Sequence, residues 1–376
     1  MKNKFSISTI LQNKSVSSIL APIFAIVLGL LFGYLIIFIV SPNNSMKVFS
    51  VILQGGFSKG LKGVGEVLYK SVPLIFTGLA VAFAFQTGLF DIGASGQYTI
   101  GFCASLFTAF YLQDKVTGSS LWIICLLAGM IGGMIWGAIP GLFKALLNVN
   151  EVITCIMTNY IGLYLVDMLI RDNPLVYNFN SKWTKVIPEN ANVPKWGLDK
   201  IFARSSVYGG IIIAIVIAII INIILKKTKL GYELKACGFN KEAAKYAGIN
   251  QNSRIILSMI IAGGLAGLAG AMNLQSGVSY TYAPINAMDQ TGFNGIAVAL
   301  LGGNDPIGTI FAAIFFAHIK QGGFYMQTLG VKSEIIDVIV GAIIYFSALS
   351  LIIKTYLPII AKKIEKKKLA KKEKEA

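Results

Sequence analysis

The chain has 376 residues, of which 55% are hydrophobic and only 13% charged, and its formal net charge is +16 at pH 7. A soluble domain carries about a quarter charged residues, so this composition excludes an ordinary soluble domain and predicts an all-α membrane protein. The Lys residues lie beside apolar runs and do not interleave with aromatic residues on a polar face. That arrangement indicates contact with anionic lipid headgroups and argues against a nucleic-acid partner.

The hydrophobic pattern predicts about ten transmembrane helices, because one crossing needs about 20 apolar residues. The first span, residues 19–40, follows an N-terminal segment 1–18 and is longer than the apolar core of a cleaved signal peptide. The other expected spans are 70–88, 97–112, 121–143, 151–170, 207–226, 254–275, 291–303, 306–325 and 334–354. They make up a membrane domain over residues 19–355, which a Lys-rich tail at 356–376 follows.

Two Lys-rich segments, the loop 226–253 and the tail 356–376, set the expected orientation. The positive-inside rule places both in the cytoplasm, and the four spans between them give the even number of crossings that this requires. Six spans precede the loop, so the N-terminus is expected in the cytoplasm as well. The loop 171–206 then falls outside the cell.

Small residues recur every four positions in two of the spans, and such a stripe lets a second helix approach closely. The stripes are Gly129, Gly133, Gly137 and Gly141 in one span and Gly263 and Gly267 in another. They predict close helix packing and carry no information about a substrate.

Two Gly/Pro-broken segments interrupt the apolar pattern, one in each half of the chain. The first covers residues 88–97, and the second covers 292–295 and continues through 301–306. Irregular backbone at membrane depth persists only against protein or a watery cavity. Matching breaks in two halves therefore point to a transport path built from an inverted repeat. The alternative is that each break is a loop at the membrane surface.

Charged groups and metal ligands are scarce within the spans. Charges at the bilayer centre cost roughly 2.5–3.5 kcal/mol, and this chain has no dense Asp, Glu and His relay of the kind that proton pumps use. The scarcity favours an uncharged substrate over ion-coupled transport. One His and four scattered Cys indicate neither a metal site nor a catalytic constellation. The chain also lacks a P-loop, so any ATP and Mg²⁺ must be bound by another subunit.

The Lys-rich loop contains a segment that is too polar to cross a membrane but can form a short helix. Asn240 is a suitable N-cap for residues 241–246, and Gly248 is a suitable residue just past the C-terminal end. A short cytoplasmic helix between spans is a plausible contact for a motor subunit.

The order and spacing of several motifs resemble the permease subunits of bacterial ABC importers for nucleosides and simple sugars, in the branched-chain amino acid and ribose permease superfamily. The resemblance covers about residues 70–350, and its motifs lie at 90–97, 140–145, 150–153, 159–160, 238–249 and 292–308. The family usually has Asn where Asp91 stands and often Glu where Ser95 stands. The pattern at 150–153 and 292–302 looks most like the nucleoside importers.

This resemblance implies a division of labour among several chains of a bacterial cell membrane. A second related permease, or a second copy, would complete the path, an extracellular lipoprotein would deliver the substrate, and an ATP-binding cassette ATPase would drive transport. The residues implied in coupling to that ATPase are Gly238, Asn240, Glu242, Ala243, Ala244 and Gly248.

A nucleoside is neutral, with a flat base and a polar ribose, so its path needs amide or hydroxyl partners and aromatic faces. The residues expected on that path are Phe90, Gln97, Asn159, Phe293 and Asn294. Three alternatives remain open: a ribose or other sugar importer, an ion-coupled secondary transporter, and a membrane-embedded enzyme.

Overall fold

The computed structural model describes residues 14–116, 120–278, 281–332, 334–346 and 349. The chain divides into two compact units, one made of Met1–Leu53 with Gly322–Ala376 and the other of Gln54–Gln321. The predicted tail at 356–376 and most of the predicted N-terminal segment 1–18 lie outside the described residues.

The first unit is almost entirely helical in its described part. It holds α2 (Lys14–Val40), η1 (Pro42–Asn44), most of α3 (Ser45–Gln54), the end of α14, η4 (Gln327–Leu329) and a helical stretch over 334–346. Gly29 and Gly33 of α2 lie against Ile343 and Ile339 of that last stretch. A side chain at either glycine would collide with these isoleucines, so the two helices depend on glycine for their close approach.

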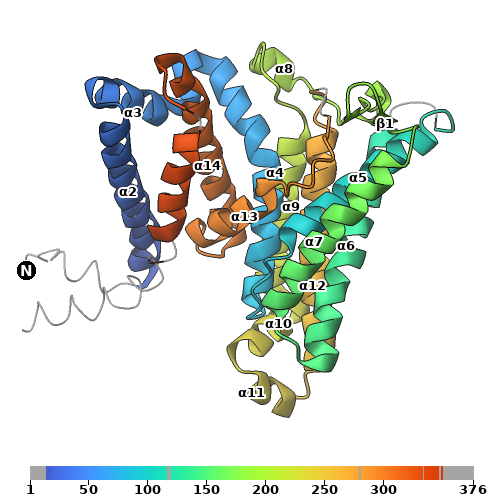
Figure 1. Ribbon diagram of the computed structural model, residues 1–376. Helices are drawn as coiled ribbons and strands as arrows, with labels where there is room; N and C mark the ends of the chain where they lie inside the picture. The colour runs from blue at the N-terminus through green and yellow to red at the C-terminus, as the bar shows by residue number, and fades with distance from the viewer. Residues whose placement is uncertain (1–13, 117–119, 279–280, 333, 347–348, 350–376) are drawn as a thin grey trace, which may run out of the picture. The chain divides into compact units, whose positions relative to one another are not determined.

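The second unit is a helical bundle with one small hairpin (Figure 1). Its elements are η2 (Gly55–Lys59), α4 (Gly60–Gln86), α5 (Ala94–Leu112), α6 (Leu121–Leu147), α7 (Glu151–Arg171), β1 (Tyr177–Asn178), β2 (Trp183–Thr184), η3 (Glu189–Ala191), α8 (Leu198–Ile201), α9 (Gly210–Lys227), α10 (Lys229–Phe239), α11 (Lys241–Tyr246), α12 (Gln251–Leu274), α13 (Gln290–Leu301) and most of α14 (Pro306–Met326). The antiparallel hairpin pairs Tyr177 with Thr184 and Asn178 with Trp183.

The predicted glycine stripes form the crossing of α5, α6 and α12. A Cβ atom on Gly137 would lie 2.9 Å from the Cα of Gly263, and one on Gly267 would lie 2.8 Å from the Cα of Gly133. Gly101 of α5 faces the backbone of Gly267 in the same way. Backbones this close leave no room for larger side chains, which confirms the close packing that the stripes predict.

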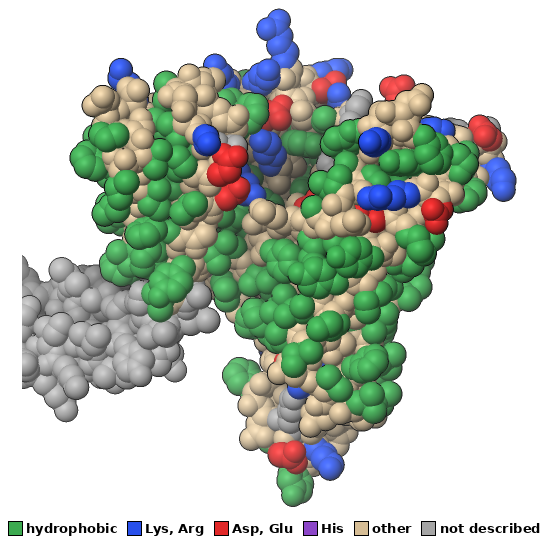
Figure 2. Space-filling model, viewed as in Figure 1, with side chains coloured by type: hydrophobic (Ala, Val, Ile, Leu, Met, Phe, Trp, Pro, Cys, Tyr) green, Lys and Arg blue, Asp and Glu red, His purple; other side chains and the backbone are tan. Residues whose placement is uncertain are grey.

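The all-α membrane class is confirmed. Within the described residues, seven segments are long and apolar enough to cross a membrane, which does not confirm the predicted count of about ten. The described part of each predicted span is mostly helical, but α5, α13 and the helical stretch over 334–346 are not among the seven. On the face that Figure 2 shows, hydrophobic side chains cover the middle of the second unit, and charged side chains gather towards its two ends. The inverted repeat stays a prediction.

The two predicted breaks have different outcomes. Residues 87–93 are non-helical, so α4 and α5 are separated as predicted, and residues 302–305 separate α13 from α14. The prediction of a break at 292–295 was wrong, because these residues form the first turns of α13. The carboxylate of Asp289 accepts a hydrogen bond from the Thr291 N–H at 2.7 Å and so caps the helix just before this stretch.

Candidate functional site: a buried elbow and an amide-lined cavity

The elbow is the segment 87–93, which joins α4 to α5. Its second residue is Gly88, whose φ of +69° favours a residue without a side chain. It continues to Asp91, whose side chain is fully buried. The Oδ1 atom of Asp91 accepts a hydrogen bond from the Gly93 N–H at 2.8 Å and fixes the start of α5. The sequence therefore builds a tight turn that is held from within by its own carboxyl group.

The Asp91 carboxyl group is surrounded by neutral partners. Gln97 donates through Nε2 to Oδ2 at 3.1 Å, and the Cys155 thiol lies 3.4 Å from Oδ1. None of the ion pairs among the described residues includes Asp91. The N-terminal end of α5, which carries a partial positive charge, begins three residues after Asp91 at Ala94. Asn, which the resemblance implies at this position, could accept the same Gly93 hydrogen bond.

Asn159 of α7 clasps the elbow from the neighbouring helix. Its Oδ1 atom accepts a hydrogen bond from the Gly96 N–H at 2.8 Å, and its Nδ2 donates to the Ile92 carbonyl at 3.0 Å. The first N–H groups of a helix have no partner within the helix, so a side chain from α7 supplies one for α5. The amide of Asn159 is thus a structural tie between two helices.

A cavity of about 440 Å³ lies beside this tie. Its lining combines apolar, aromatic and amide side chains from α7, from the segment before α13 and from α13 itself: Ile156, Asn159, Tyr160, Leu163, Asn286, Met288, Gln290 and Phe293. A volume of this size is typical of small-molecule sites, which are mostly apolar with a few polar groups.

The cavity unites only part of the predicted substrate path. Asn159 and Phe293 line it. Phe90 instead packs on Phe85, with ring centroids 5.2 Å apart. Gln97 is buried against Asp91. Asn294 is half-buried and does not line the cavity. Sequence reasoning missed six lining residues. The 4- and 7-residue spacing of Ile156, Tyr160 and Leu163 could have indicated one face of α7, but the partners before α13 have no periodic signal.

Asp167 holds the segment before α13 in place. Its carboxylate accepts hydrogen bonds from the Tyr282 hydroxyl and the Asn286 N–H, both at 2.7 Å. Arg171, one turn later on α7, donates to the carbonyl of Pro284. These charged side chains of α7 therefore provide hydrogen-bond partners for the non-helical segment before α13. This segment places Asn286 and Met288 at the cavity.

The predicted short helix in the Lys-rich loop is confirmed as α11. Asn240 caps it by accepting a hydrogen bond from the Ala243 N–H at 3.1 Å, and Gly248 follows it with a φ of +77°. Figure 1 shows α10 and α11 at the opposite end of this unit from α8 and the hairpin. Of the predicted coupling residues, Ala244 is buried.

Two aromatic residues flank α11 and are almost fully exposed. Phe239 is 91% exposed and Tyr246 is 92% exposed, which is unusual for large side chains. Isolated exposed apolar residues are common, but here one ends α10 just before α11 and the other ends α11 itself, so the two lie close together in the sequence. Sequence reasoning missed both, because exposure depends on how α10 and α11 project from the bundle.

The loop also contacts the elbow through backbone. A Cβ atom on Gly238 of α10 would lie 2.7 Å from the Gln86 carbonyl oxygen and 2.9 Å from the Gly88 nitrogen. The Thr87 and Ser258 hydroxyls share a buried hydrogen bond of 2.6 Å, which ties the elbow to α12. Gly238, which the resemblance implied in coupling, therefore lies directly between the loop and the elbow.

The start of α14 is held by Asp305, which forms a 2.6 Å ion pair with Lys226 of α9. The other carboxylate oxygen accepts hydrogen bonds from the N–H groups of Ile307 and Gly308 at 3.1 and 3.2 Å. Partial burial favours the neutral acid, but Lys226 and these two N–H groups outweigh burial and lower the pKa of Asp305 below its ordinary value of 3.8.

Because the pKa of Asp305 is lower in the folded state than in the unfolded chain, its stabilising effect is present above pH 3.8 and is lost as the pH falls through the folded-state value. Asp305→Asn is expected to lower the melting temperature of the protein at neutral pH. The melting temperature of this variant should also fall less steeply than that of the wild type as the pH is lowered. The effect should stay below about 1 kcal/mol, since solvent screens a half-exposed pair. Thermal unfolding in detergent across this pH range, with Asp199→Asn on α8 as control, measures it. An unchanged acid dependence in Asp305→Asn would contradict the assignment.

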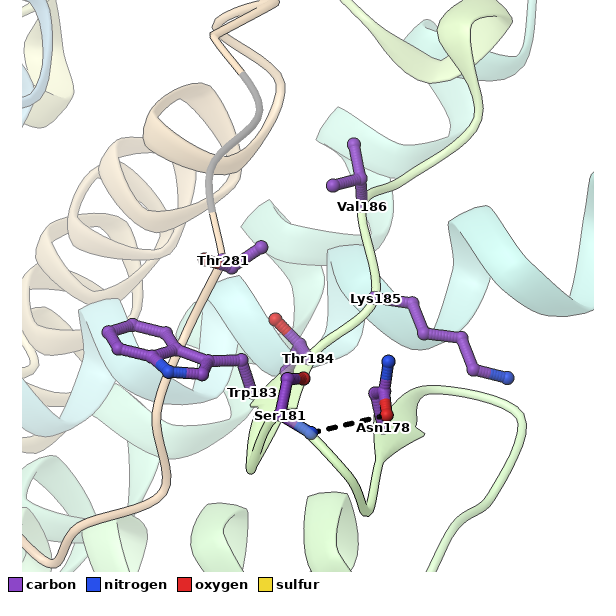
Figure 3. Close-up of a pocket in the computed structure, with 7 residues that line it drawn as sticks. All are labelled: Asn178, Ser181, Trp183, Thr184, Lys185, Val186 and Thr281. Carbon is purple, nitrogen blue, oxygen red and sulfur yellow. Dashed lines mark hydrogen bonds between the residues drawn. The ribbon is translucent and has the colours of Figure 1, made fainter.

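A second hollow, of about 470 Å³, lies on the hairpin (Figure 3). It is lined by Asn178, Ser181, Trp183, Thr184, Lys185, Val186 and Thr281. The Ser181 N–H donates to Asn178 Oδ1 at 3.4 Å, and Lys185 donates to the Pro174 carbonyl at 2.9 Å. None of the predicted path residues lines it. Across the described part of the chain, no group of three or more His, Cys, Asp or Glu side chains could hold a metal ion.

Comparison with known proteins identifies the class of this chain. A nucleoside ABC transporter permease protein, NupB of Lactococcus lactis, is 37% identical over 92% of this chain and 95% of its own length. A guanosine ABC transporter permease protein, NupP of Bacillus subtilis, is 39% identical over 93% of this chain and 99% of its own. A glucose ABC transporter permease protein, TsgB13 of Haloferax volcanii, is 29% identical over 78% of each. No solved structure gives a significant match. The family model for the branched-chain amino acid transport system / permease component matches residues 63–348, so the chain is a multi-pass membrane protein that belongs to this permease family.

Proposed function

We propose that this chain is the transmembrane permease subunit of an ATP-binding cassette importer and forms part of the translocation path for nucleosides. The observation that carries the proposal is its similarity, over almost the whole of both chains, to two permeases named for nucleoside and guanosine transport. Chains that align from end to end at this identity share a fold and a mode of assembly. The neutral lining of the cavity beside the elbow supports an uncharged substrate.

Transport by such a chain requires partners. The same two organisms have further relatives, NupC of L. lactis and NupQ of B. subtilis, which are 26% and 29% identical to this chain. Two related permeases in each organism support a heterodimeric path, with a homodimer as the alternative. A separate ATPase subunit binds ATP and Mg²⁺, and an extracellular lipoprotein presents the substrate. This chain catalyses no covalent step.

The Lys-rich loop with α10 and α11 faces the cytoplasm in this proposal, as do both termini, and residues 171–206 face outward across the bacterial cell membrane. The end of the bundle that carries α11 is then where the ATPase docks. The coupling segment is made up of Glu242, Ala243 and Ala244 of α11, with Gly238, Asn240 and Gly248 on either side of this helix. Phe239 and Tyr246 anchor it, because exposed aromatic residues dominate the energetics of many interfaces.

Phe239→Ala and Tyr246→Ala are each expected to weaken binding of the ATPase to the permease by roughly 30-fold, the equivalent of a 2 kcal/mol hot-spot contact. The physical reason is the loss of a large aromatic surface that the partner would bury. Titration of the purified ATPase onto the permease pair in nanodiscs measures the affinity. Tyr232→Ala on α10, also an exposed aromatic residue, is the control. Wild-type affinity in both test variants would rule out this docking surface.

The proposed cargo is tested by uptake of labelled guanosine, uridine and ribose in cells with and without this gene. Loss on deletion of nucleoside uptake that resists a proton ionophore is the expected result. Loss of ribose uptake alone would keep the ABC mechanism and change the cargo to a sugar, an alternative that the relative from H. volcanii supports. Uptake that collapses with the ionophore while ATP is held constant would instead indicate an ion-coupled secondary transporter.

A further inference from the structure

The cavity beside the elbow contains features that specify one class of ligand. Two aromatic residues from different elements, Tyr160 of α7 and Phe293 of α13, line the same space, and both are substantially exposed. Met288, Ile156 and Leu163 complete an apolar wall. A flat, uncharged ring is the ligand that such a surface accommodates, since aromatic faces and thioether groups pack well against π systems.

Three of the side chains that line the cavity are amides, and they differ in whether they already form hydrogen bonds within the protein. The amide of Asn159 is already bonded to Gly96 and Ile92. The side-chain amides of Gln290 and Asn286 are exposed and make no hydrogen bond to any described residue. An amide offers both donors and an acceptor, so these two groups can pair with the mixed donor and acceptor edge of a nucleobase or with ribose hydroxyls.

The cavity is also unsuited to a charged ligand such as an amino acid. None of its eight lining residues is Asp, Glu, Lys, Arg or His. The N-terminus of α13 borders it and could attract a carboxylate, but the Asp289 carboxylate already occupies that end through its bond to the Thr291 N–H. A zwitterion would therefore lose hydration at both charges without a compensating partner.

We propose that this cavity holds the nucleoside in transit, with Tyr160 and Phe293 stacking on the base and with Gln290 and Asn286 hydrogen-bonding its polar edges. Asn159 is a positioning residue, which acts by holding α7 against the elbow. The assignment rests on the proposed function, and it adds a substrate site and a role for each residue. It also predicts that selectivity within the membrane is for an aromatic, neutral ring.

The test uses the complete transporter, reconstituted in proteoliposomes with its permease partner, ATPase and binding protein. Tyr160→Ala and Phe293→Ala are each expected to lower guanosine uptake about tenfold, because each removes an aromatic face on which the base stacks. ATPase stimulation by loaded binding protein should remain, since the coupling segment is untouched. Tyr164→Ala is the matched control: it lies one turn further along α7, is similarly exposed and does not line the cavity.

Two further variants keep the test decisive if an alanine variant does not fold. Tyr160→Leu and Phe293→Leu preserve apolar volume and remove only the aromatic face, so they should show the same loss, whereas Tyr160→Phe should transport normally. Wild-type uptake in both the alanine and leucine variants would overturn the site while leaving the proposed function intact. A wild-type complex that takes up no nucleoside would overturn both.

Discussion

Asn159→Leu is expected to reduce nucleoside uptake by more than tenfold in a protein that still reaches the membrane. The substitution removes the acceptor of the Gly96 N–H and the donor to the Ile92 carbonyl. Each buried group left without a partner costs about 1–3 kcal/mol, and both lie in or next to the elbow. The start of α5 is then free to shift relative to α7, which changes the wall of the cavity.

Uptake in proteoliposomes, together with binding-protein-stimulated ATP hydrolysis, measures the effect. Asn294→Leu is the control, because Asn294 was predicted on the same path but is half-buried outside the cavity lining. We expect it to retain most of the uptake. Asn159→Asp should be intermediate, since it keeps the acceptor for Gly96 and loses the donor to Ile92. Equal uptake in Asn159→Leu and the wild type would show that the clasp has no part in transport.

Gly133→Leu is expected to prevent folding almost completely. Gly133 of α6 lies where a Cβ atom would be 2.7 Å from the Cα of Gly267, and it also faces the Gly263 carbonyl oxygen on α12. The obstacle is backbone, which cannot move aside as a flexible side chain can. Helix association in lipid depends on close packing rather than on hydrophobic burial, so a forced separation of α6 from α12 removes the main source of stability of this crossing.

The yield of monodisperse protein in mild detergent measures this effect. Gly341→Leu is the matched control: it is also a helical glycine, but a side chain there would meet open space. We expect near wild-type yield from Gly341→Leu and little or none from Gly133→Leu. Similar yields from the two variants would show that the α6–α12 crossing tolerates separation.

The elbow connects the two parts of the proposed mechanism. On one side Gly238 of the coupling segment rests on the backbone at Gln86 and Gly88. On the other side Asn159, a residue of the cavity wall, binds the backbone at Ile92 and Gly96. A displacement of α10 on ATP binding would therefore reach the cavity through one short, buried stretch of chain. The contacts from Gly238 through the elbow to Asn159 are contiguous. Variants of the elbow that impair substrate transport without weakening ATPase binding test whether these contacts couple the two sites.

Several features of the protein could be predicted from the sequence because they depend on local patterns. The ten apolar stretches predict helices, the four-residue glycine spacing predicts a close crossing, and Asn240 with Gly248 predicts the limits of α11. The elbow could be predicted because Gly88 and Gly93 interrupt an apolar run at a carboxylate. The sequence could not distinguish a true break from the glycine-rich first turns of α13, because Gly292 and Gly295 serve there as packing positions against α5 and α4.

Tertiary structure alone decided which residues meet. Asn159 and Phe293 come to one cavity while Phe90, Gln97 and Asn294 do not, although all five were chosen for the same chemistry. Phe90 and Gln97 pack instead on Phe85 and Asp91. The segment before α13, which Asp167 and Arg171 of α7 hold in place, supplies other lining residues. A contact between residues more than a hundred positions apart depends on how helices pack and where irregular backbone finds its hydrogen bonds. The sequence by itself thus determined the helices, their glycine crossings and the neutral character of the predicted path, and packing decided which residues line the proposed site.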